Sequence, residues 1–310
     1  MIKFGYALTW NWTSDIGIDF HKALDEIAIT GWDGIEMNAG FLYYYLEHIE
    51  ELKKLLKLHN LGLSSFYSHL ELINDDTFKS DLHTVKSKIK LIKELGADIL
   101  LIDGGWKNPE GVSDSDYKGA VEKIKRVCEL AHLNGLKPTW HIHWGTMFDR
   151  EDIFEYMMEE TRQDNLYLCP DTAQLFLSQM DPLEVIKKYG SRISYIHFKD
   201  LDENPFINKY LKPLKEIDPK NNTLHPLSSA GTYEYINDRY LDNGAFHINS
   251  KYRFVEVGRG IIDFKAIVKT VKEMNYKGWL VVDQDYTGYR NMESLDVNLK
   301  NIKYLFNEVK

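Results

Sequence analysis

Histidines and carboxylates stand at the ends of four short apolar runs in the second half of the chain. These segments are 141–146 (HIHWGT), 170–174 (PDTAQ), 196–200 (IHFKD) and 281–285 (VVDQD). Imidazole nitrogens and carboxylate oxygens are ligands that divalent metals take in proteins. An imidazole is also suited to proton transfer, because its unperturbed pKa lies near neutrality. The four segments therefore indicate metal binding, proton transfer or both.

Some of these residues also have purely structural explanations. Asp171 ends an apolar run and suits a turn or helix cap as well as a metal site. His197 could be a hydrogen-bonded core residue of its strand. Lys199 lies on the same strand face two positions later, and a buried ammonium group needs a partner or a task, which favours a functional reading of both.

The other two segments leave similar alternatives. His141 and His143 share one strand face and suit ligation or general base work, with surface exposure as the alternative. Asp283 and Asp285 repel each other unless a cation lies between them. Asp285 could simply cap the next loop, which leaves Asp283 as the better ligand candidate.

The elements that would position these residues alternate along the whole chain. Short β-branched or aromatic runs alternate with amphipathic helical segments, which is typical of βαβ units and a parallel sheet. We expect eight strands, near residues 3–8, 34–37, 62–67, 98–103, 137–143, 166–169, 193–198 and 279–283. We expect helices near residues 46–56, 86–95, 118–133, 153–161, 183–189, 262–274 and 292–306, with C-terminal caps at glycines 31, 62, 96, 135 and 278.

This pattern predicts an α/β fold, a single (β/α)8 TIM barrel over residues 1–310. The carboxyl ends of all strands in such a barrel meet at one mouth, so the four segments would converge there. Residues 201–253 form a long insertion after the seventh strand, rich in Pro, Asn, Asp and Tyr. Connections of this length are usually functional or disordered, and the aromatic content favours an ordered lid or an oligomer contact. A homo-oligomer is therefore compatible with the sequence.

Composition restricts the partners. Lys plus Arg number 38 and Asp plus Glu number 47, so the formal net charge is −9, which disfavours nucleic acid as a partner. No signal peptide and no apolar stretch of the ~18 residues that a membrane helix needs is visible. Only Cys128 and Cys169 are present, too few for a disulfide framework. We expect a cytoplasmic protein that does not bind membranes.

Aromatic and polar residues also follow the earlier strands. They include Trp10, Asn11, Glu36, His69 and Trp106. An aromatic ring packs against the C–H face of a sugar, while amides and carboxylates bind its hydroxyl groups. This rim favours a polyhydroxylated ligand.

Several phrases of the sequence resemble the xylose isomerase-like TIM barrel superfamily of sugar isomerases and epimerases, and within it the inosose dehydratase-like members. The phrases are residues 31–36 (GWDGIE), 143–146 (HWGT), 197–200 (HFKD), 258–264 (GRGIIDF) and 278–282 (GWLVV). The resemblance implies one divalent metal ion held at the ends of strands five to eight. Carried over position by position, the ligands are His141, Asp171, His197 and Asp283.

Two of these positions depart from the common pattern of the superfamily. His141 stands where many relatives have Glu, although the inosose dehydratase branch also has histidines there, and Asp283 stands where Glu is usual. These changes argue against an epimerase mechanism based on two glutamates. Gln174 stands where relatives often have His, and an amide can bind a hydroxyl group but cannot take a proton.

The resemblance implies that a keto-sugar or keto-cyclitol loses the proton α to its carbonyl. His143 is the first candidate base and Asp283 the second, and Lys199 could stabilise the oxyanion or protonate a departing hydroxyl. Trp144, Gln174 and Arg259 complete the expected substrate contacts. For the metal we expect Mn, with Co, Fe and Zn as alternatives.

Three alternatives to a dehydratase stay open. The same first chemical step leads to a sugar or sugar-phosphate isomerase or epimerase. The replaced glutamates and the insertion would also suit a non-catalytic sugar-binding or partner subunit. An endonuclease can share this barrel, but such an enzyme needs a basic groove, which the acidic composition does not offer.

Overall fold

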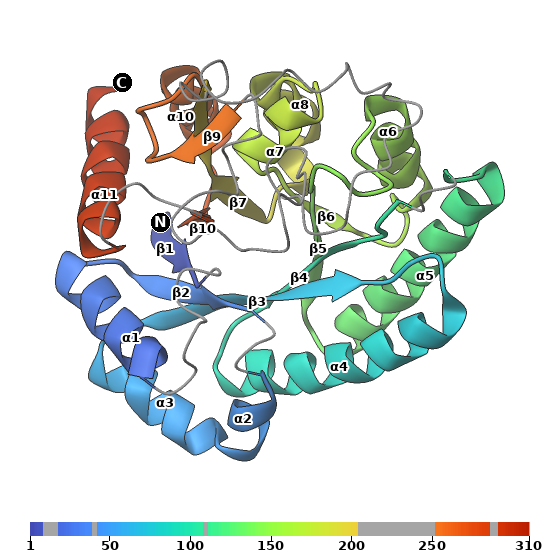
Figure 1. Ribbon diagram of the computed structural model, residues 1–310, viewed down its shortest axis with the longest axis horizontal. Coiled ribbons are helices and arrows are strands. Elements are labelled where there is room, and N and C mark those ends of the chain that lie inside the picture. The colour runs from blue at the N-terminus through green and yellow to red at the C-terminus, as the bar shows by residue number, and fades with distance from the viewer. Residues whose placement is uncertain (9–17, 39–41, 108–110, 204–251, 286–290, 310) are drawn as a thin grey trace, which may run out of the picture.

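Eight parallel strands form the barrel (Figure 1). The computed structural model describes residues 1–8, 18–38, 42–107, 111–203, 252–285 and 291–309. The strands are β1 (Lys3–Ala7), β2 (Gly34–Met37), β3 (Gly62–Leu70), β4 (Ile99–Gly104), β5 (Lys137–His141), β6 (Tyr167–Cys169), β7 (Tyr195–Phe198) and β10 (Trp279–Val282). Their order is β6-β5-β4-β3-β2-β1-β10-β7, and parallel bridges from Leu168 to Ile193 and from Asp171 to His197 connect β6 with β7. The predicted TIM barrel is confirmed.

Helices surround the strands on the outside (Figure 1). They are α1 (Ile18–Thr30), α2 (Leu42–Glu47), α3 (Ile49–Leu58), α4 (Asp75–Glu94), α5 (Asp114–Leu133), α6 (Glu151–Glu160), α7 (Thr172–Leu177), α8 (Pro182–Tyr189), α10 (Phe264–Glu273) and α11 (Asn291–Glu308), with the 3-10 turn η3 (Gly190–Arg192) before β7. Every expected helix is present. The expected helix at 46–56 is interrupted at His48, and α4 begins 11 residues earlier than expected, at Asp75 after the N-cap Asn74.

Two of the five expected glycine caps were wrong. Gly31, Gly96 and Gly135 have the positive φ of a helix C-cap. Before β3 and β10, the positive φ belongs instead to Asn60 and Asn275. The glycines of these two turns, Gly62 and Gly278, begin or immediately precede their strands; a Cβ on Gly278 would lie 2.7 Å from the Tyr276 hydroxyl, so that position requires a small residue because of close packing.

Side chains inside the barrel change from apolar to polar toward the carboxyl ends of the strands. An apolar layer contains Ala7, Ile99, Leu101, Cys169, Tyr195 and Val281. Because side chains alternate along a strand, inward-pointing residues recur at every second position. Two positions further on stand Asp103, Asp171, His197 and Asp283. The polar layer of the mouth therefore rests on a packed apolar layer.

The insertion begins and ends in a short antiparallel pair, β8 (Asp200–Glu203) and β9 (Tyr252–Val255). The buried Asp200 carboxylate accepts hydrogen bonds from the backbone N–H groups of Leu201, Gly258, Gly260 and Ile262, at 2.9, 2.9, 2.8 and 3.3 Å. Burial raises the pKa of Asp200 to about 6, although these donors oppose the shift. Residues 204–251, the main part of the expected lid, lie outside the described residues.

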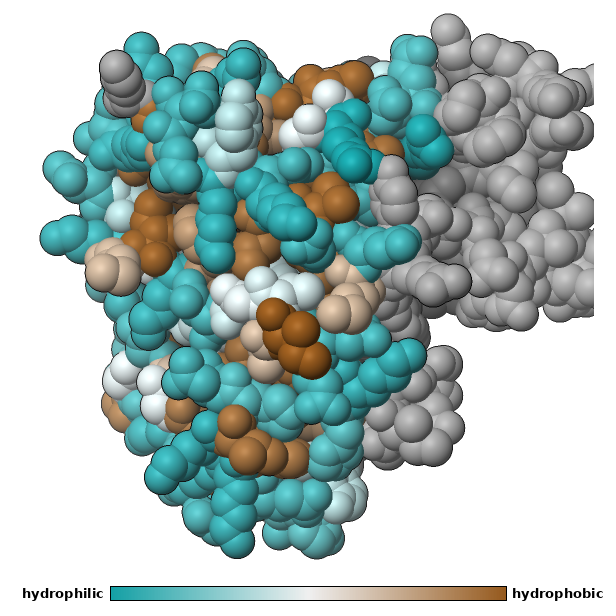
Figure 2. Space-filling model, turned by 90° about the vertical axis from the view of Figure 1, so that its left-hand side faces the viewer, coloured by the Kyte–Doolittle hydropathy of each residue, from teal (hydrophilic) through white to brown (hydrophobic). Residues whose placement is uncertain are grey.

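The face of the molecule at the left of Figure 1 is mostly hydrophilic. Figure 2 shows the side of the molecule that lies at the left of Figure 1, where hydrophobic side chains form small groups among hydrophilic ones. Ile29 and Tyr304 are among the exposed large hydrophobic residues. Within the described part of the chain, no helix combines the length and the apolar character needed to cross a bilayer.

Candidate metal centre

Four residues from four strand ends meet at the mouth of the barrel. His141 ends β5, Asp171 follows β6, His197 lies in β7 and Asp283 follows β10. All four are buried, and one potential ligand atom from each lies within 4.8 Å of the others. The barrel therefore brings together the four residues to which the family resemblance assigned the metal.

The distances inside this cluster are long for hydrogen bonds and suitable for ligands of one ion. Oδ2 of Asp171 lies 3.4 Å from Nε2 of His141 and 3.5 Å from Nδ1 of His197. Nδ1 of His197 lies 3.8 Å from Oδ2 of Asp283. Two ligands bound tetrahedrally at ~2.1 Å from one ion lie about 3.4 Å apart. Among the described residues Nδ1 of His197 is buried without a hydrogen-bond partner, as a lone pair reserved for a metal would be.

Neighbouring groups orient two of these side chains. Oδ1 of Asp171 accepts hydrogen bonds from the backbone N–H groups of Ala173 and Gln174, which caps α7 and leaves Oδ2 facing the cluster. Nε2 of His197 lies 2.8 Å from Oε2 of Glu36, and a proton on that nitrogen leaves Nδ1 free to coordinate. Sequence reasoning placed Glu36 on the substrate rim and missed this contact.

Electrostatic interactions in the cluster keep its carboxylates charged. Burial opposes ionisation of Asp171, but the neighbouring imidazoles of His141 and His197 and the charge of Lys199 lower its pKa below the usual value. Burial also lowers the pKa of His197, but Glu36 and Asp171 outweigh it and raise this pKa to about 10. The carboxylates therefore favour a positive charge at this position, which a bound cation would supply in place of the second imidazole proton of His197.

Lys199 joins the two aspartates after β10. Its fully buried Nζ lies 2.8 Å from Oδ2 of Asp283 and 2.5 Å from Oδ2 of Asp285, above the ring of Phe254. Burial lowers the pKa of Lys199, but the two carboxylates outweigh it and raise the pKa above the usual value. Lys199 is therefore a permanent cation beside the cluster.

His143 lies just beyond β5. Its Nδ1 donates to the carbonyl oxygen of Trp144 at 2.7 Å, which leaves Nε2 as the basic nitrogen. Burial lowers the pKa of His143 to about 4, opposed by Asp103 and assisted by His141. The half-buried Trp144 donates its backbone N–H to Oε1 of the buried Gln174, at 3.1 Å. This bond connects the end of β5 to α7.

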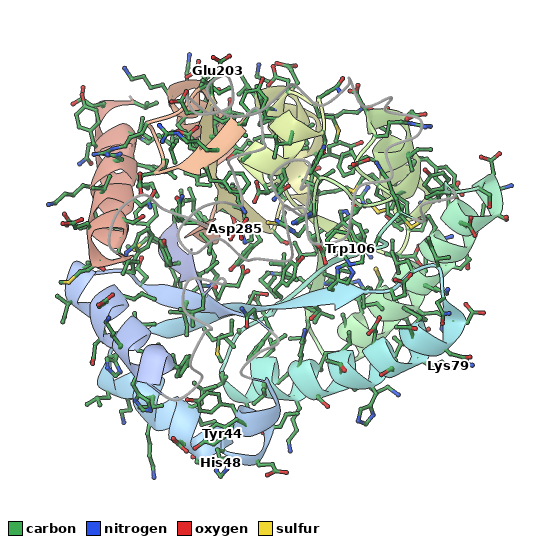
Figure 3. All side chains as sticks on the ribbon, in the orientation of Figure 1. Tyr44, His48, Lys79, Trp106, Glu203 and Asp285 are labelled. Carbon is green, nitrogen blue, oxygen red and sulfur yellow. The ribbon has the colours of Figure 1, made fainter. Side chains whose placement is uncertain are left out.

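A second polar group lies beside the cluster, at the ends of β3 and β4. The fully buried Asp103 lies 2.9 Å from Nδ1 of His69 and accepts a short hydrogen bond from the Tyr67 hydroxyl. The ring of Trp106 stacks on His69 with centroids 4.7 Å apart and contacts His143 edge-on at 5.8 Å. In Figure 3, Trp106 and Asp285 lie toward the middle of the barrel, whereas the labelled helical residues lie at its periphery.

Three further residues were predicted as substrate contacts: Trp10, Asn11 and Arg259. Trp10 and Asn11 lie outside the described residues. Arg259 is exposed in the turn after β9, and its backbone N–H bonds to the carbonyl oxygen of Glu256. Its guanidinium is not part of the described metal cluster.

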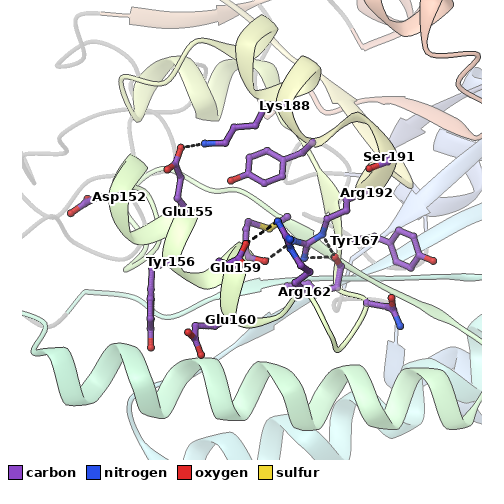
Figure 4. Close-up of a pocket in the computed structure, with 14 residues that line it drawn as sticks. Asp152, Glu155, Tyr156, Glu159, Glu160, Arg162, Tyr167, Lys188, Ser191 and Arg192 are labelled. Atoms are coloured by element: carbon purple, nitrogen blue, oxygen red, sulfur yellow. Dashed lines mark hydrogen bonds and ion pairs between the residues drawn. The ribbon is translucent and has the colours of Figure 1, made fainter.

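A pocket of about 850 Å³ lies on the outside of the barrel, along α6 and the turn before β7 (Figure 4). Its charged side chains are paired: Lys188 with Glu155, and Arg162 with Glu159. Arg192 donates to the backbone carbonyls of Met158 and Leu166. This pocket contains none of the four clustered residues.

The chain belongs to the xylose isomerase-like TIM barrel family, whose sequence model matches residues 24–305. It is 26% identical over 295 residues to the inosose dehydratase of Clostridium botulinum strain Alaska E43, covering 88% of this chain and 87% of that protein. It is 25% identical over 311 residues to the inosose dehydratase of Lacticaseibacillus casei, covering 95% and 93%.

Solved structures share the fold at lower identity. The IolI protein with a binding zinc atom has a TM-score of 0.71 at 15% identity, covering 99% of both chains. The probable 3-DHS dehydratase AsbF of Bacillus anthracis also has a TM-score of 0.71, at 17% identity, covering 97% of this chain and 98% of that one. At these identities the likeness concerns the fold alone.

Proposed function

We propose that this protein is a divalent-metal-dependent lyase of the inosose dehydratase type, which removes water from a keto-cyclitol or keto-sugar. The observation that carries this proposal is the cluster of His141, Asp171, His197 and Asp283, with an unpartnered buried imidazole nitrogen inside it. Curated relatives named inosose dehydratase, aligned over most of both chains, favour this reaction over other activities of the family.

In this proposal the four clustered residues hold one ion. Such an ion would supply Lewis-acid chemistry, polarising a substrate carbonyl and so favouring loss of the α-proton. Two imidazoles and two carboxylates suit a transition metal better than Mg or Ca, and we favour Mn, with Co, Fe and Zn as alternatives. Zinc in the related IolI structure agrees with an ion of this class.

The chain's own groups would handle the proton. With its lowered pKa, His143 is neutral at pH 7. Its Nδ1–H is bound to the Trp144 carbonyl oxygen, so Nε2 is the nitrogen that takes the α-proton. Lys199 places a fixed positive charge beside Asp283 and so favours an oxyanion in the mouth. Trp106 offers a ring face to the C–H face of the substrate.

Dehydration and metal binding can be tested separately. Metal-free protein with 2-keto-myo-inositol and Mn²⁺ should generate enone absorbance, and turnover of a ketohexose without that signal would indicate an isomerase or epimerase instead. The purified protein should contain about one equivalent of metal, reduced in His197→Ala and Asp171→Ala. Normal metal content in both variants would refute the ligand assignment.

A further inference from the structure

The pair of His69 and Asp103 lies at the mouth on β3 and β4, and β4 is the neighbour of β5, which carries His141 of the metal cluster. In the β3–β4 ladder, His69 and Asp103 are register partners. In the β4–β5 ladder, Ile102 pairs with Trp140. The residues that follow them, Asp103 and His141, are therefore neighbours on adjacent strands. Adjacent strands lie ~4.8 Å apart, so His69 stands on the order of 10 Å from His141 across two strand spacings. The pair therefore lies beside the metal cluster, at the same end of the barrel.

The hydrogen bonds of this pair leave one reactive nitrogen. Nδ1 of His69 bonds to Asp103, and Asp103 is fixed in place by Tyr67 on its other oxygen. Nε2 of His69 is buried and has no hydrogen-bond partner among the described residues. Trp106 stacks on the imidazole and holds its plane. Asp103 therefore orients the His69 ring through Nδ1, and Nε2 remains available to a substrate.

The surroundings favour a protonated ring. Burial lowers the pKa of His69, but the carboxylate of Asp103 outweighs it and raises the pKa above the usual value, with smaller contributions from Glu71 and Asp81. The other group considered for proton donation, Lys199, already donates to two carboxylates, so two of its three protons are engaged. His69 is the better-placed donor.

We propose that His69 is the general acid of this site, donating a proton from Nε2 to the departing hydroxyl group, and that Asp103 is its positioning residue. This role rests on the dehydration proposed above. In the elimination, the base takes the α-proton and the C–H electron pair forms the new double bond. The β C–O bond breaks, its electron pair stays on oxygen, and the proton from His69 completes the leaving water. His69 is left neutral and regains a proton from solvent.

If His69 acts only on the departing hydroxyl, its replacement should slow dehydration but not the removal of the α-proton. In D₂O with Mn²⁺, His69→Gln should still exchange the α-hydrogen of 2-keto-myo-inositol for deuterium, at close to the wild-type rate, but its dehydration rate should fall by ~10²-fold or more. His143→Gln should lose both activities. Unchanged dehydration in His69→Gln would overturn the proposal, and so would equal loss of exchange and dehydration.

The matched control is His59, which also pairs with an aspartate. Nε2 of His59 lies 2.8 Å from Asp25 and Nδ1 lies 2.8 Å from the Leu55 carbonyl oxygen, so both nitrogens are occupied, at the end of α3 outside the barrel. His59→Gln should change neither rate. A comparable loss of dehydration in His59→Gln would mean that the effect of His69→Gln reflects general damage, and would overturn the assignment.

A second measurement does not depend on the substrate. In ¹⁵N-histidine spectra, the His69 signals, identified by their absence in His69→Gln, should show a protonated Nδ1 that is lost in Asp103→Asn. An unprotonated Nδ1 in the wild type would refute the His69–Asp103 hydrogen bond, even if dehydration is slow in His69→Gln. If the wild type neither exchanges nor dehydrates any keto-cyclitol or ketose while Nδ1 is protonated, the dehydratase function fails and the acid assignment falls with it, but the His69–Asp103 pair stands.

Discussion

The Glu36 carboxylate lies 2.8 Å from Nε2 of His197, although 161 residues separate them in the sequence. Glu36 is at the end of β2 and His197 is on β7, so the contact spans the interior of the barrel. A proton on Nε2 directs the lone pair of Nδ1 toward Asp171 and Asp283. Tyr195 donates to the same Glu36 oxygen at 2.9 Å and keeps it in place.

This contact predicts that Glu36 controls metal affinity without binding the metal. Glu36→Gln removes the negative charge that favours the Nε2–H form of His197, so metal affinity should fall ~10- to 100-fold. The measurement is a competition titration of metal-free protein against a chelator of known affinity. Ser64→Ala is the control, because it removes the 2.6 Å bond to Tyr195 and keeps Glu36; an equal loss of affinity in both variants would contradict the specific role of Glu36.

The sequence was sufficient to predict the strand ends of the site. The run before Asp171 and the run before Asp283 are apolar and then turn polar, and a parallel barrel brings such ends to one mouth wherever they stand in the chain. That rule needs no knowledge of side-chain contacts. It explains why four residues named from separate segments lie within 4.8 Å of one another.

The partners of these residues could not be predicted in the same way. Glu36 pairs with His197 and Asp103 with His69 because of barrel closure and strand register, which local periodicity does not encode. The antiparallel pair of β8 and β9 was also missed, since its halves are separated by the insertion and neither carries a turn signal. Its start at Asp200 is held by backbone donors after β9.

Asp171 has two functions that one substitution can separate. Its Oδ1 caps α7 and its Oδ2 faces the two histidines. Asn caps helices as well as Asp does, so Asp171→Asn should fold but lose the anionic ligand. At free metal 100 times the dissociation constant, the wild type should gain about 2.7 kcal/mol of unfolding free energy, and the variant should gain little.

The control for this substitution is another aspartate cap. Asp181 caps α8 through the backbone N–H groups of Leu183 and Glu184 and is not part of the cluster. Asp181→Asn should keep the full metal-dependent gain, measured by urea unfolding with and without Mn²⁺. An equal gain in Asp171→Asn would show that Oδ2 does not bind the ion.

Two glycine substitutions should change stability in opposite directions. A Cβ on Gly260 would lie 2.1 Å from the Leu201 carbonyl oxygen and 2.4 Å from the Asp200 carboxylate, so Gly260→Ala must displace the segment that anchors β8. Gly119 lies inside α5, and a Cβ added there would meet nothing within 4 Å. Gly119→Ala should therefore stabilise the protein by about 0.5–1 kcal/mol through helix propensity.

For Gly260→Ala we expect a loss of about 1–3 kcal/mol, since backbone donors to Asp200 would be pulled away from their acceptor. Thermal unfolding of both variants beside the wild type measures the two effects. A Gly260→Ala protein as stable as Gly119→Ala would show that the anchoring segment adapts to the methyl group.

Lys88 gives the stability a specific pH dependence. It is buried on α4, and its Nζ donates to the Tyr67 carbonyl oxygen at 2.6 Å. Burial lowers its pKa from 10.5 to about 8, against the attraction of Asp103 and Asp81. Below pH 8 the folded protein therefore carries a poorly solvated charge, whereas the same charge is hydrated in the unfolded chain. As the pH rises from 8 to 10.5 the folded state releases this proton first, so folding becomes more favourable.

Lys88→Met removes that titration and is the direct test. The unfolding free energy of the wild type minus that of Lys88→Met should increase by roughly 3 kcal/mol between pH 7 and pH 10.5, because each pKa unit corresponds to about 1.4 kcal/mol. Urea unfolding of both proteins at the two pH values measures the difference, in which the titrations of other groups cancel. Lys79→Met, at an exposed position of the same helix, should change stability by less than about 0.5 kcal/mol at pH 7. A difference between wild type and Lys88→Met that stays constant with pH would mean that Lys88 keeps its proton throughout, held by Asp103 and Asp81 more strongly than burial opposes it.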